Sequence, residues 1–221
     1  MPVREQEPHD PAAAVRQLAE EFRQPLGTIE SIAHYLGMVL PRGQTSARRQ
    51  LGRLQDEVRQ MHWILAETLY FSQAAPLNLQ RLDLTEAVSR DLAESSPAEG
   101  TGLSFDLEAN LPPVWLDLAQ VQHLLRGIVA FFRRVSVPGG LIVVRTCGAK
   151  DEVALEIASE MLEYSAEDIQ PLFEPFGSHF PPGLALGLAS ARRIAEAHGG
   201  RVQAISAPPH SLTLSIAFPA A

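Results

Sequence analysis

Two long amphipathic patterns, separated by a short polar break, fill the first third of the chain. Apolar residues recur at steps of three and four over Val15–Leu40, which predicts a helix of roughly 28 residues that Pro25 should kink. A second stripe covers Leu51–Leu69, and residues 41–46 between the two contain Pro, Gly and helix-capping residues. The pattern predicts an antiparallel helical hairpin over residues 12–75.

One hairpin has too little interior to bury both apolar stripes. Pairing with a second hairpin as a four-helix bundle solves this problem, and we therefore expect a homodimer. The alternative is that the stripes pack only against the rest of the same chain. Residues 1–11 are polar, contain two prolines and lack an apolar period, so we expect a frayed tail.

Helical and strand-like patterns alternate in the remainder, residues 76–221, after a linker at residues 74–78. We expect a second domain of the α+β class, in which helices pack on a largely antiparallel sheet. The predicted helices cover residues 84–92, 118–135 and 185–198, and the predicted strands cover 103–107, 141–147, 153–158, 201–206 and 212–218.

Composition excludes several classes of protein. Apolar residues make up 46% and charged residues 20%, no apolar run approaches the ~20 residues of a membrane span, and the N-terminus lacks a secretory pattern. Cys147 is the only cysteine and lies in an apolar run, which indicates a cytoplasmic protein with a buried, inert thiol. The net charge of −8 comes mainly from residues 76–221, which argues against nucleic acid as a partner.

Several short sequence motifs occur along the chain, and their order is informative. Leu18–Leu26 reads LAEEFRQPL, Leu172–Phe176 reads LFEPF, Gly183–Leu188 reads GLALGL, and a glycine-ended helix follows. Together they resemble the catalytic core of sensor histidine kinases over residues 12–219. The resemblance implies a dimerisation hairpin with an "H box", followed by a GHKL-type ATP-binding domain with the Bergerat α/β sandwich fold.

In the hairpin, the resemblance places Glu20 where the family has its phosphoacceptor histidine. A carboxylate cannot replace imidazole as the nucleophile that forms phosphohistidine. Glu21 occupies the position of the acidic general base, which then has no histidine to activate. His34 and His62 lack the sequence context of the acceptor, and we interpret them as surface or packing residues.

The ATP-binding motifs depart from the family as well. Gly127 and Phe131 stand where two asparagines of the N box belong, and a phenyl ring offers Mg²⁺ no oxygen ligand. Ser159 replaces the aspartate that reads adenine, and Met161 and Glu163 replace two glycines of the same G1 box. We therefore expect neither ATP nor Mg²⁺ to bind, and no other metal site is predicted.

The last glycine-rich motif is half kept. Gly183 and Gly187 remain, but Ala185 replaces the middle glycine, and the lid at residues 177–182 is short and contains two prolines. A glycine-rich turn that opens a helix can hold an anion, although packing on the sheet explains these glycines equally well.

The sequence leads to one main hypothesis and several alternatives. We predict a dimeric pseudo-histidine-kinase that binds a response-regulator receiver domain or a cognate histidine kinase in a phosphorelay, through Phe22, Leu26, Thr28, Ile32 and Leu36. The first alternative is a phosphatase in which Gln24 orients water toward a receiver's aspartyl phosphate. A histidine phosphotransferase fails because of Glu20, and a working ATP-binding sensor kinase remains the interpretation that homology alone favours.

Overall fold

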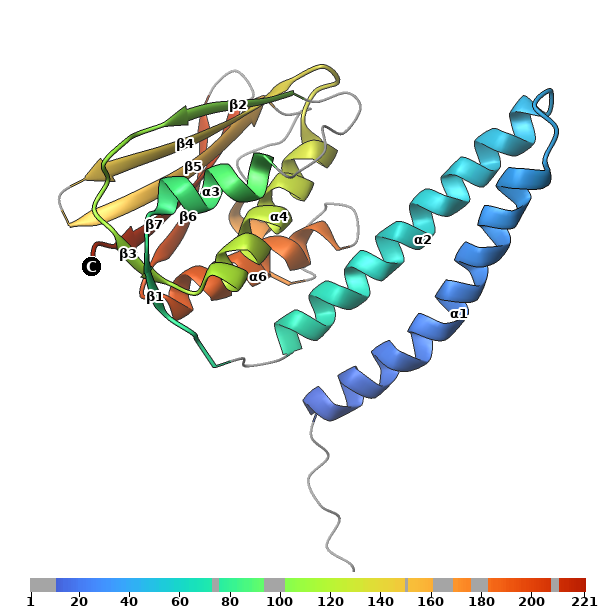
Figure 1. Ribbon diagram of the computed structural model, residues 1–221, viewed down its shortest axis with the longest axis horizontal. Coiled ribbons are helices and arrows are strands. Elements are labelled where there is room, and N and C mark those ends of the chain that lie inside the picture. The colour runs from blue at the N-terminus through green and yellow to red at the C-terminus, as the bar shows by residue number, and fades with distance from the viewer. Residues whose placement is uncertain are drawn as a thin grey trace, which may run out of the picture. The chain divides into compact units, whose positions relative to one another are not determined.

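The computed structural model describes residues 11–72, 76–93, 102–149, 151–160, 169–175, 183–207 and 211–221. The chain forms two compact units, Met1–Ala74 and Ala75–Ala221 (Figure 1). The sequence pattern predicted this boundary one residue later, between residues 75 and 76. The predicted tail lies outside the described residues except for Pro11, which is the first residue of a helix.

The first unit is a helical hairpin of α1 (Pro11–Val39) and α2 (Thr45–Ser72), with Pro25 inside α1. Three α1 residues at seven-residue spacing, Ala19, Leu26 and Ala33, are buried. Four residues beyond the last of these, Gly37 approaches Leu51 of α2, so this face of α1 packs against the second helix.

Arg48 fixes the connection between the two helices. Its guanidinium donates hydrogen bonds to the carbonyl oxygens of Leu40 and Pro41, the latter at 3.3 Å from Nε. Both carbonyls lie in the turn just after α1, and the Pro41 oxygen also accepts from the backbone N–H of Gln44 at 3.1 Å. One side chain from α2 therefore holds the turn that joins the two helices.

The second unit is built on a five-stranded sheet with the order β2-β4-β5-β7-β6. Strands β2 and β4 are parallel, and the other neighbouring pairs are antiparallel. The strands are β2 (Gly102–Leu107), β4 (Leu141–Ala149), β5 (Glu152–Glu160), β6 (Arg201–Ala207) and β7 (Ser211–Pro219). A separate antiparallel pair, β1 (Gln80–Leu82) with β3 (Val114–Leu116), was not predicted.

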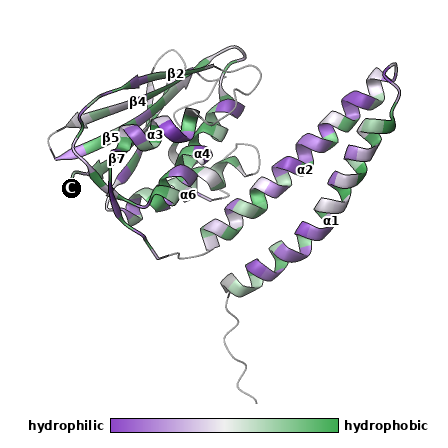
Figure 2. Ribbon diagram, viewed as in Figure 1, coloured by the Kyte–Doolittle hydropathy of each residue, from purple (hydrophilic) through white to green (hydrophobic). Residues whose placement is uncertain are grey.

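Three helices lie on one side of this sheet (Figure 1): α3 (Leu84–Ala93), α4 (Leu118–Val135) and α6 (Leu184–Ala197). A short 3₁₀ helix, η1 (Gln170–Phe173), precedes α6. Alternate residues of β5, Val153, Leu155 and Ile157, are fully buried, as a sheet covered on one face requires. Figure 2 shows the same division, with apolar residues gathered where helices and sheet meet. The predicted α+β class is confirmed.

Within the described residues, no helix has both the length and the apolar content needed to cross a membrane. Cys147 on β4 is half-buried, and burial raises the pKa of its thiol above the ordinary value. The thiol is therefore held in its protonated, poorly nucleophilic form at neutral pH.

Candidate functional site

Asp117 organises the start of α4, the helix that carries the N-box positions. Its Oδ1 accepts hydrogen bonds from the backbone N–H groups of Ala119 (3.0 Å) and Gln120 (3.2 Å), and its Oδ2 accepts from Asn78 N–H (2.9 Å). Burial by itself would raise the pKa of Asp117, but these three donors outweigh it and hold the pKa below the ordinary value. The carboxylate is thus a charged helix cap.

The end of α6 is joined to the same point. The backbone N–H of Asp117 donates to Nε2 of the buried His198 at 3.0 Å, and His198 Nδ1 lies 2.8 Å from the Ile194 carbonyl oxygen. Because Nε2 accepts, Nδ1 carries the proton and the imidazole is neutral. The N-terminus of α4 therefore meets the C-terminus of α6, which makes the two helices antiparallel.

Further along, the two helices touch through glycine. A Cβ atom on Gly127 of α4 would lie 3.1 Å from the carbonyl oxygen of Gly187 on α6. Each of these glycines stands at a position that the resemblance assigns to nucleotide binding. The backbones of α4 and α6 therefore approach each other closely at these two glycines.

Phe131 lies one helical turn beyond Gly127 and is completely buried. Its ring packs edge-on against Phe132, with ring centroids 5.5 Å apart and an interplanar angle of 75°. Both N-box positions therefore lie in packed protein and offer no oxygen ligand. Among the described residues, no group of three or more His, Cys, Asp or Glu side chains is placed to hold a metal ion.

Gly183 begins α6 in the left-handed region, with φ of 92°. This conformation favours glycine whether or not an anion binds, so the turn itself accounts for the residue. Ala185 and Gly187 follow as buried residues of the first helical turns.

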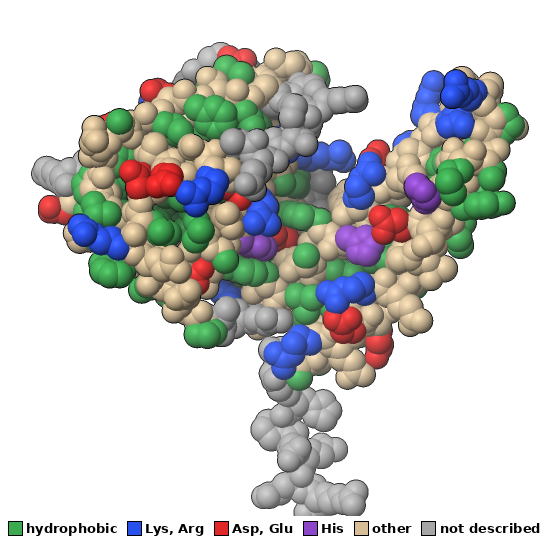
Figure 3. Space-filling view, in the orientation of Figure 1, with side chains coloured by type: hydrophobic (Ala, Val, Ile, Leu, Met, Phe, Trp, Pro, Cys, Tyr) green, Lys and Arg blue, Asp and Glu red, His purple; other side chains and the backbone are tan. Residues whose placement is uncertain are grey.

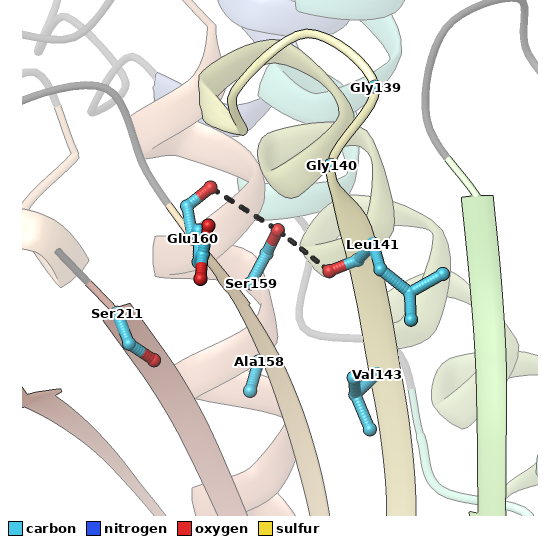
Figure 4. Close-up of a pocket in the computed structure, with 8 residues that line it drawn as sticks. All are labelled: Gly139, Gly140, Leu141, Val143, Ala158, Ser159, Glu160 and Ser211. Carbon is cyan, nitrogen blue, oxygen red and sulfur yellow. Dashed lines mark hydrogen bonds between the residues drawn. The ribbon is translucent and has the colours of Figure 1, made fainter.

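Ser159 lies near the end of β5 and makes structural hydrogen bonds (Figure 4). Strands β4 and β5 are paired as far as Val143 and Ala158, beyond which Ser159 Oγ donates to the Leu141 carbonyl oxygen at 3.0 Å. Ser136 Oγ lies 2.7 Å away and donates to Ser159. The hydroxyl therefore bridges two strands where their ladder ends.

A pocket of about 420 Å³ lies beside Ser159 and is lined by the eight residues labelled in Figure 4. Glu160 is the only charged residue among them, and the others are small or apolar. Val143 and Ala158 alternate with the buried Val144 and Ile157, so the pocket opens on the face of the sheet opposite the helices and apart from the N-box positions on α4. Met161, Glu163 and the predicted lid at 177–182 lie outside the described residues.

On the hairpin, Glu20 and Gln24 are exposed one turn apart on α1. The Glu20 carboxylate forms an ion pair with Arg23, and Gln17 Nε2 donates to Glu21 Oε1 at 3.1 Å. The hydroxyl of Thr28 donates to the backbone oxygen of Gln24 at 3.1 Å. Within the described residues, the side-chain amide of Gln24 has no hydrogen-bond partner.

The residues predicted for partner binding divide into three sets. Thr28 is exposed on the face of α1 that carries Gln24. Leu26 is only 2% exposed, so its prediction as a contact residue is wrong, because it packs inside the hairpin. Phe22, Ile32 and Leu36 are exposed and belong to an apolar stripe along α1, which also contains Leu18, Ile29 and Val39. Figure 3 shows apolar side chains at the outer edge of the hairpin, toward its turn.

Comparison with known proteins shows which proteins share this architecture. The family of histidine kinase-, DNA gyrase B- and HSP90-like ATPases matches residues 117–221. Sensor histidine kinase ZraS of Klebsiella oxytoca is 28% identical over 198 residues, which cover 86% of this chain and 42% of ZraS. The chain is similar to the catalytic core of sensor histidine kinases. The family resemblance drawn from the sequence motifs is therefore confirmed.

Solved structures agree on the fold of this histidine kinase-like core. Full-length ShkA in complex with AMPPNP matches with a TM-score of 0.73 and 19% identity, over 95% of this chain and 46% of ShkA. Histidine kinase ThkA in complex with the response regulator protein TrrA matches with a TM-score of 0.67 and 19% identity, over 95% of this chain and 61% of that chain. The chain spans about half the length of the curated relatives it matches.

Proposed function

We propose that this histidine kinase-like core binds a response-regulator receiver domain and does so without using Mg-ATP. The observation that carries the proposal is the contact of Gly127 with Gly187, beside the buried ring of Phe131. A kinase must hold a nucleotide and its metal at these positions. Here they hold a helix–helix contact and an apolar core.

The chemical argument against ATP concerns both charge and ligands. Mg²⁺ requires hard oxygen ligands, which glycine and phenylalanine side chains cannot supply. A triphosphate gains affinity from cations and free backbone N–H groups. Gly127 and Phe131 lie inside helix α4 and offer neither a cation nor a free backbone N–H group. With Glu20 at the acceptor position, the chain also lacks the nucleophile of autophosphorylation.

The apolar stripe of α1 supports a homodimer. Side chains such as Phe22 and Ile32 are about half exposed in one hairpin, together with Leu54 and Met61 of α2. Burying an apolar side chain of this size fully contributes about 1.5–3 kcal/mol, so a stripe of six favours association strongly. A second copy presents the same stripe and completes a four-helix bundle.

Dimerisation leaves the opposite face of α1 for a receiver domain. Glu20 and Gln24 are exposed there, whereas Phe22, Ile32 and Leu36 belong to the stripe and Thr28, one turn before Ile32, lies at its edge. The similar kinase ThkA has been solved with a response regulator, which supports the same class of partner for this chain. A cognate histidine kinase is the other candidate partner, since its hairpin would pair with the same stripe.

A phosphatase activity is the second candidate function. The exposed amide of Gln24 is unpaired within the described residues and lies one turn after Glu20. An amide in that position can orient water toward an aspartyl phosphate, a reaction that needs positioning more than covalent chemistry. This activity requires neither ATP nor an acceptor histidine.

The test is a binding measurement of the purified full chain against receiver domains from the same organism, with and without Mg-ATP. We expect at least one receiver to bind equally well in both conditions, and no radiolabel to pass from ATP to the chain. Gln24→Arg should weaken that binding by about tenfold or more, because it places a bulky cation in the docking face. Phosphorylation of the chain from ATP, or no receiver bound, contradicts the proposal.

A further inference from the structure

Glu20 presents a carboxylate at the position that the family resemblance assigns to the phosphoacceptor histidine. Its side chain is 67% exposed, on the face of α1 that lies opposite the apolar stripe. Phe22 is two residues further on, which is roughly 200° around a helix with 3.6 residues per turn. Association through the stripe therefore leaves this carboxylate open to solvent and to a partner.

Only a weak interaction restrains the carboxylate. Arg23 pairs with Glu20 at i,i+3 spacing, and the Arg23 side chain is itself 52% exposed. Exposed pairs of this kind are easily opened, because water solvates both ions nearly as well as they solvate each other. A partner that offers a cation can take Glu20 from Arg23.

We infer that Glu20 makes this chain prefer receiver domains whose acceptor aspartate is unphosphorylated and carries Mg²⁺. The inference rests on the receiver binding proposed above. In that state the metal has coordination positions to fill, and a carboxylate oxygen is a ligand that Mg²⁺ accepts. Glu20 then occupies the place from which a kinase would deliver its phosphoryl group.

The phosphorylated receiver is the unfavourable partner. A phosphoryl group adds between about one and two negative charges and itself satisfies the metal. Placing the Glu20 carboxylate against it brings like charges together at a desolvated contact, which disfavours binding. The face of α1 that carries Glu20 would thus bind unphosphorylated receivers and release phosphorylated ones. A phosphatase that used Gln24 needs the opposite preference.

The test uses one receiver domain that binds the chain in the experiment above. Its affinity for the chain is measured in two states, with Mg²⁺ alone and with Mg²⁺ plus beryllofluoride as a phosphoryl mimic. The full-length chain should bind the first state about tenfold or more tightly than the second, a difference of about 1.4 kcal/mol. Removal of Mg²⁺ with EDTA should weaken binding to the unmodified receiver. Glu20→Gln should lose both the preference and the dependence on Mg²⁺.

Asp56→Asn provides the matched control. Asp56 and Arg59 form another exposed i,i+3 ion pair on the same hairpin, with side chains 68% exposed, and the substitution removes the same charge. This variant should keep the preference for the unmodified receiver. Circular dichroism of both variants should match wild type, since each change lies at an exposed helical position.

Two results would overturn the inference while leaving receiver binding intact. One is equal or tighter binding of the beryllofluoride form by wild type, and the other is a preference that Glu20→Gln retains. If the panel contains no receiver that binds in either state, the proposed function fails and this inference falls with it.

Discussion

A Cβ atom on Gly127 would lie 3.1 Å from the carbonyl oxygen of Gly187, 3.5 Å from its carbonyl carbon and 3.6 Å from its Cα. Helices α4 and α6 therefore meet backbone to backbone at two positions that the family resemblance assigns to nucleotide binding. The contact is fixed at its other end by the hydrogen bond from Asp117 to His198. These two glycines thus allow α4 and α6 to pack in direct backbone contact.

Restoring the family residue at Gly127 should damage the fold. Gly127→Asn adds a side chain that meets the rigid backbone of α6, and overpacking of this kind costs typically about 1–3 kcal/mol. Gly52→Ala on α2 is the control, since a Cβ there meets nothing within 4 Å. It should stabilise the hairpin by up to about 1 kcal/mol, because alanine favours helix over glycine. Urea unfolding checks both variants, and an Asn variant as stable as wild type contradicts the packing argument.

The sequence predicted the helices and strands well where pattern and capping agree. The predicted helix 118–135 coincides with α4, because Asp117 caps its first turn and the apolar period continues to Val135. The strand pair that became β4 and β5 was also anticipated, although each strand is longer than predicted. Local propensity and alternation carry enough information for such elements.

The sequence patterns could not predict contacts between residues that are far apart in the chain. Gly127 and Gly187 are 60 positions apart, so a motif reading could identify each glycine but not their contact. The pair of β1 and β3 was missed because three-residue strands carry no measurable period. Leu26 was misplaced because α1 has two apolar faces, and the sequence does not say which one packs against α2.

Mg-ATP should leave the stability of the chain unchanged. A ligand present at 100 times its dissociation constant adds about 2.7 kcal/mol to the free energy of unfolding, which is easily measured as a rise in Tm. We expect no rise with millimolar Mg-ATP, because Gly127, Phe131 and Ser159 all make internal contacts. A rise with Mg-ATP that Mg²⁺ alone does not produce would show that a nucleotide site exists.

The exposed apolar side chains of α1 and α2 should determine the oligomeric state. Light scattering should give about twice the chain mass of 24.1 kDa for wild type, as an isologous pair of hairpins requires. Leu54→Glu should give monomer or aggregate, because it places an unpaired carboxylate in the bundle. Met38→Glu is the control: Met38 is 66% exposed and lies two residues, roughly 200°, beyond Leu36 of the stripe. Wild type that stays monomeric at high protein concentration rules out this assembly.

Acid should weaken the second unit through Asp117. Its folded pKa lies below the unfolded value of about 3.9, so its stabilising effect is complete above that pH and is lost as pH falls through the folded pKa. Asp117→Asn keeps a capping oxygen without the charge and should be less stable at pH 7 by about 1 kcal/mol.

The difference between wild type and Asp117→Asn should shrink as the pH falls from 7 to 3 in urea-unfolding experiments. A difference that stays constant over this range would mean that the carboxylate charge does not stabilise the cap.

Gln24 decides whether the core is a binding module or a phosphatase. If its amide orients the attacking water, Gln24→Ala should slow loss of phosphate from a bound phospho-receiver by about tenfold or more, the usual effect of losing a positioning group. Receiver affinity should barely change, since one exposed side chain contributes little to an interface. Glu20→His should not create autophosphorylation, because Gly127 and Phe131 still occupy the nucleotide positions. Phosphate release from the receiver, followed with and without the chain, gives the answer. Wild type that binds a phospho-receiver without accelerating this release excludes the phosphatase and leaves binding as the function of the hairpin.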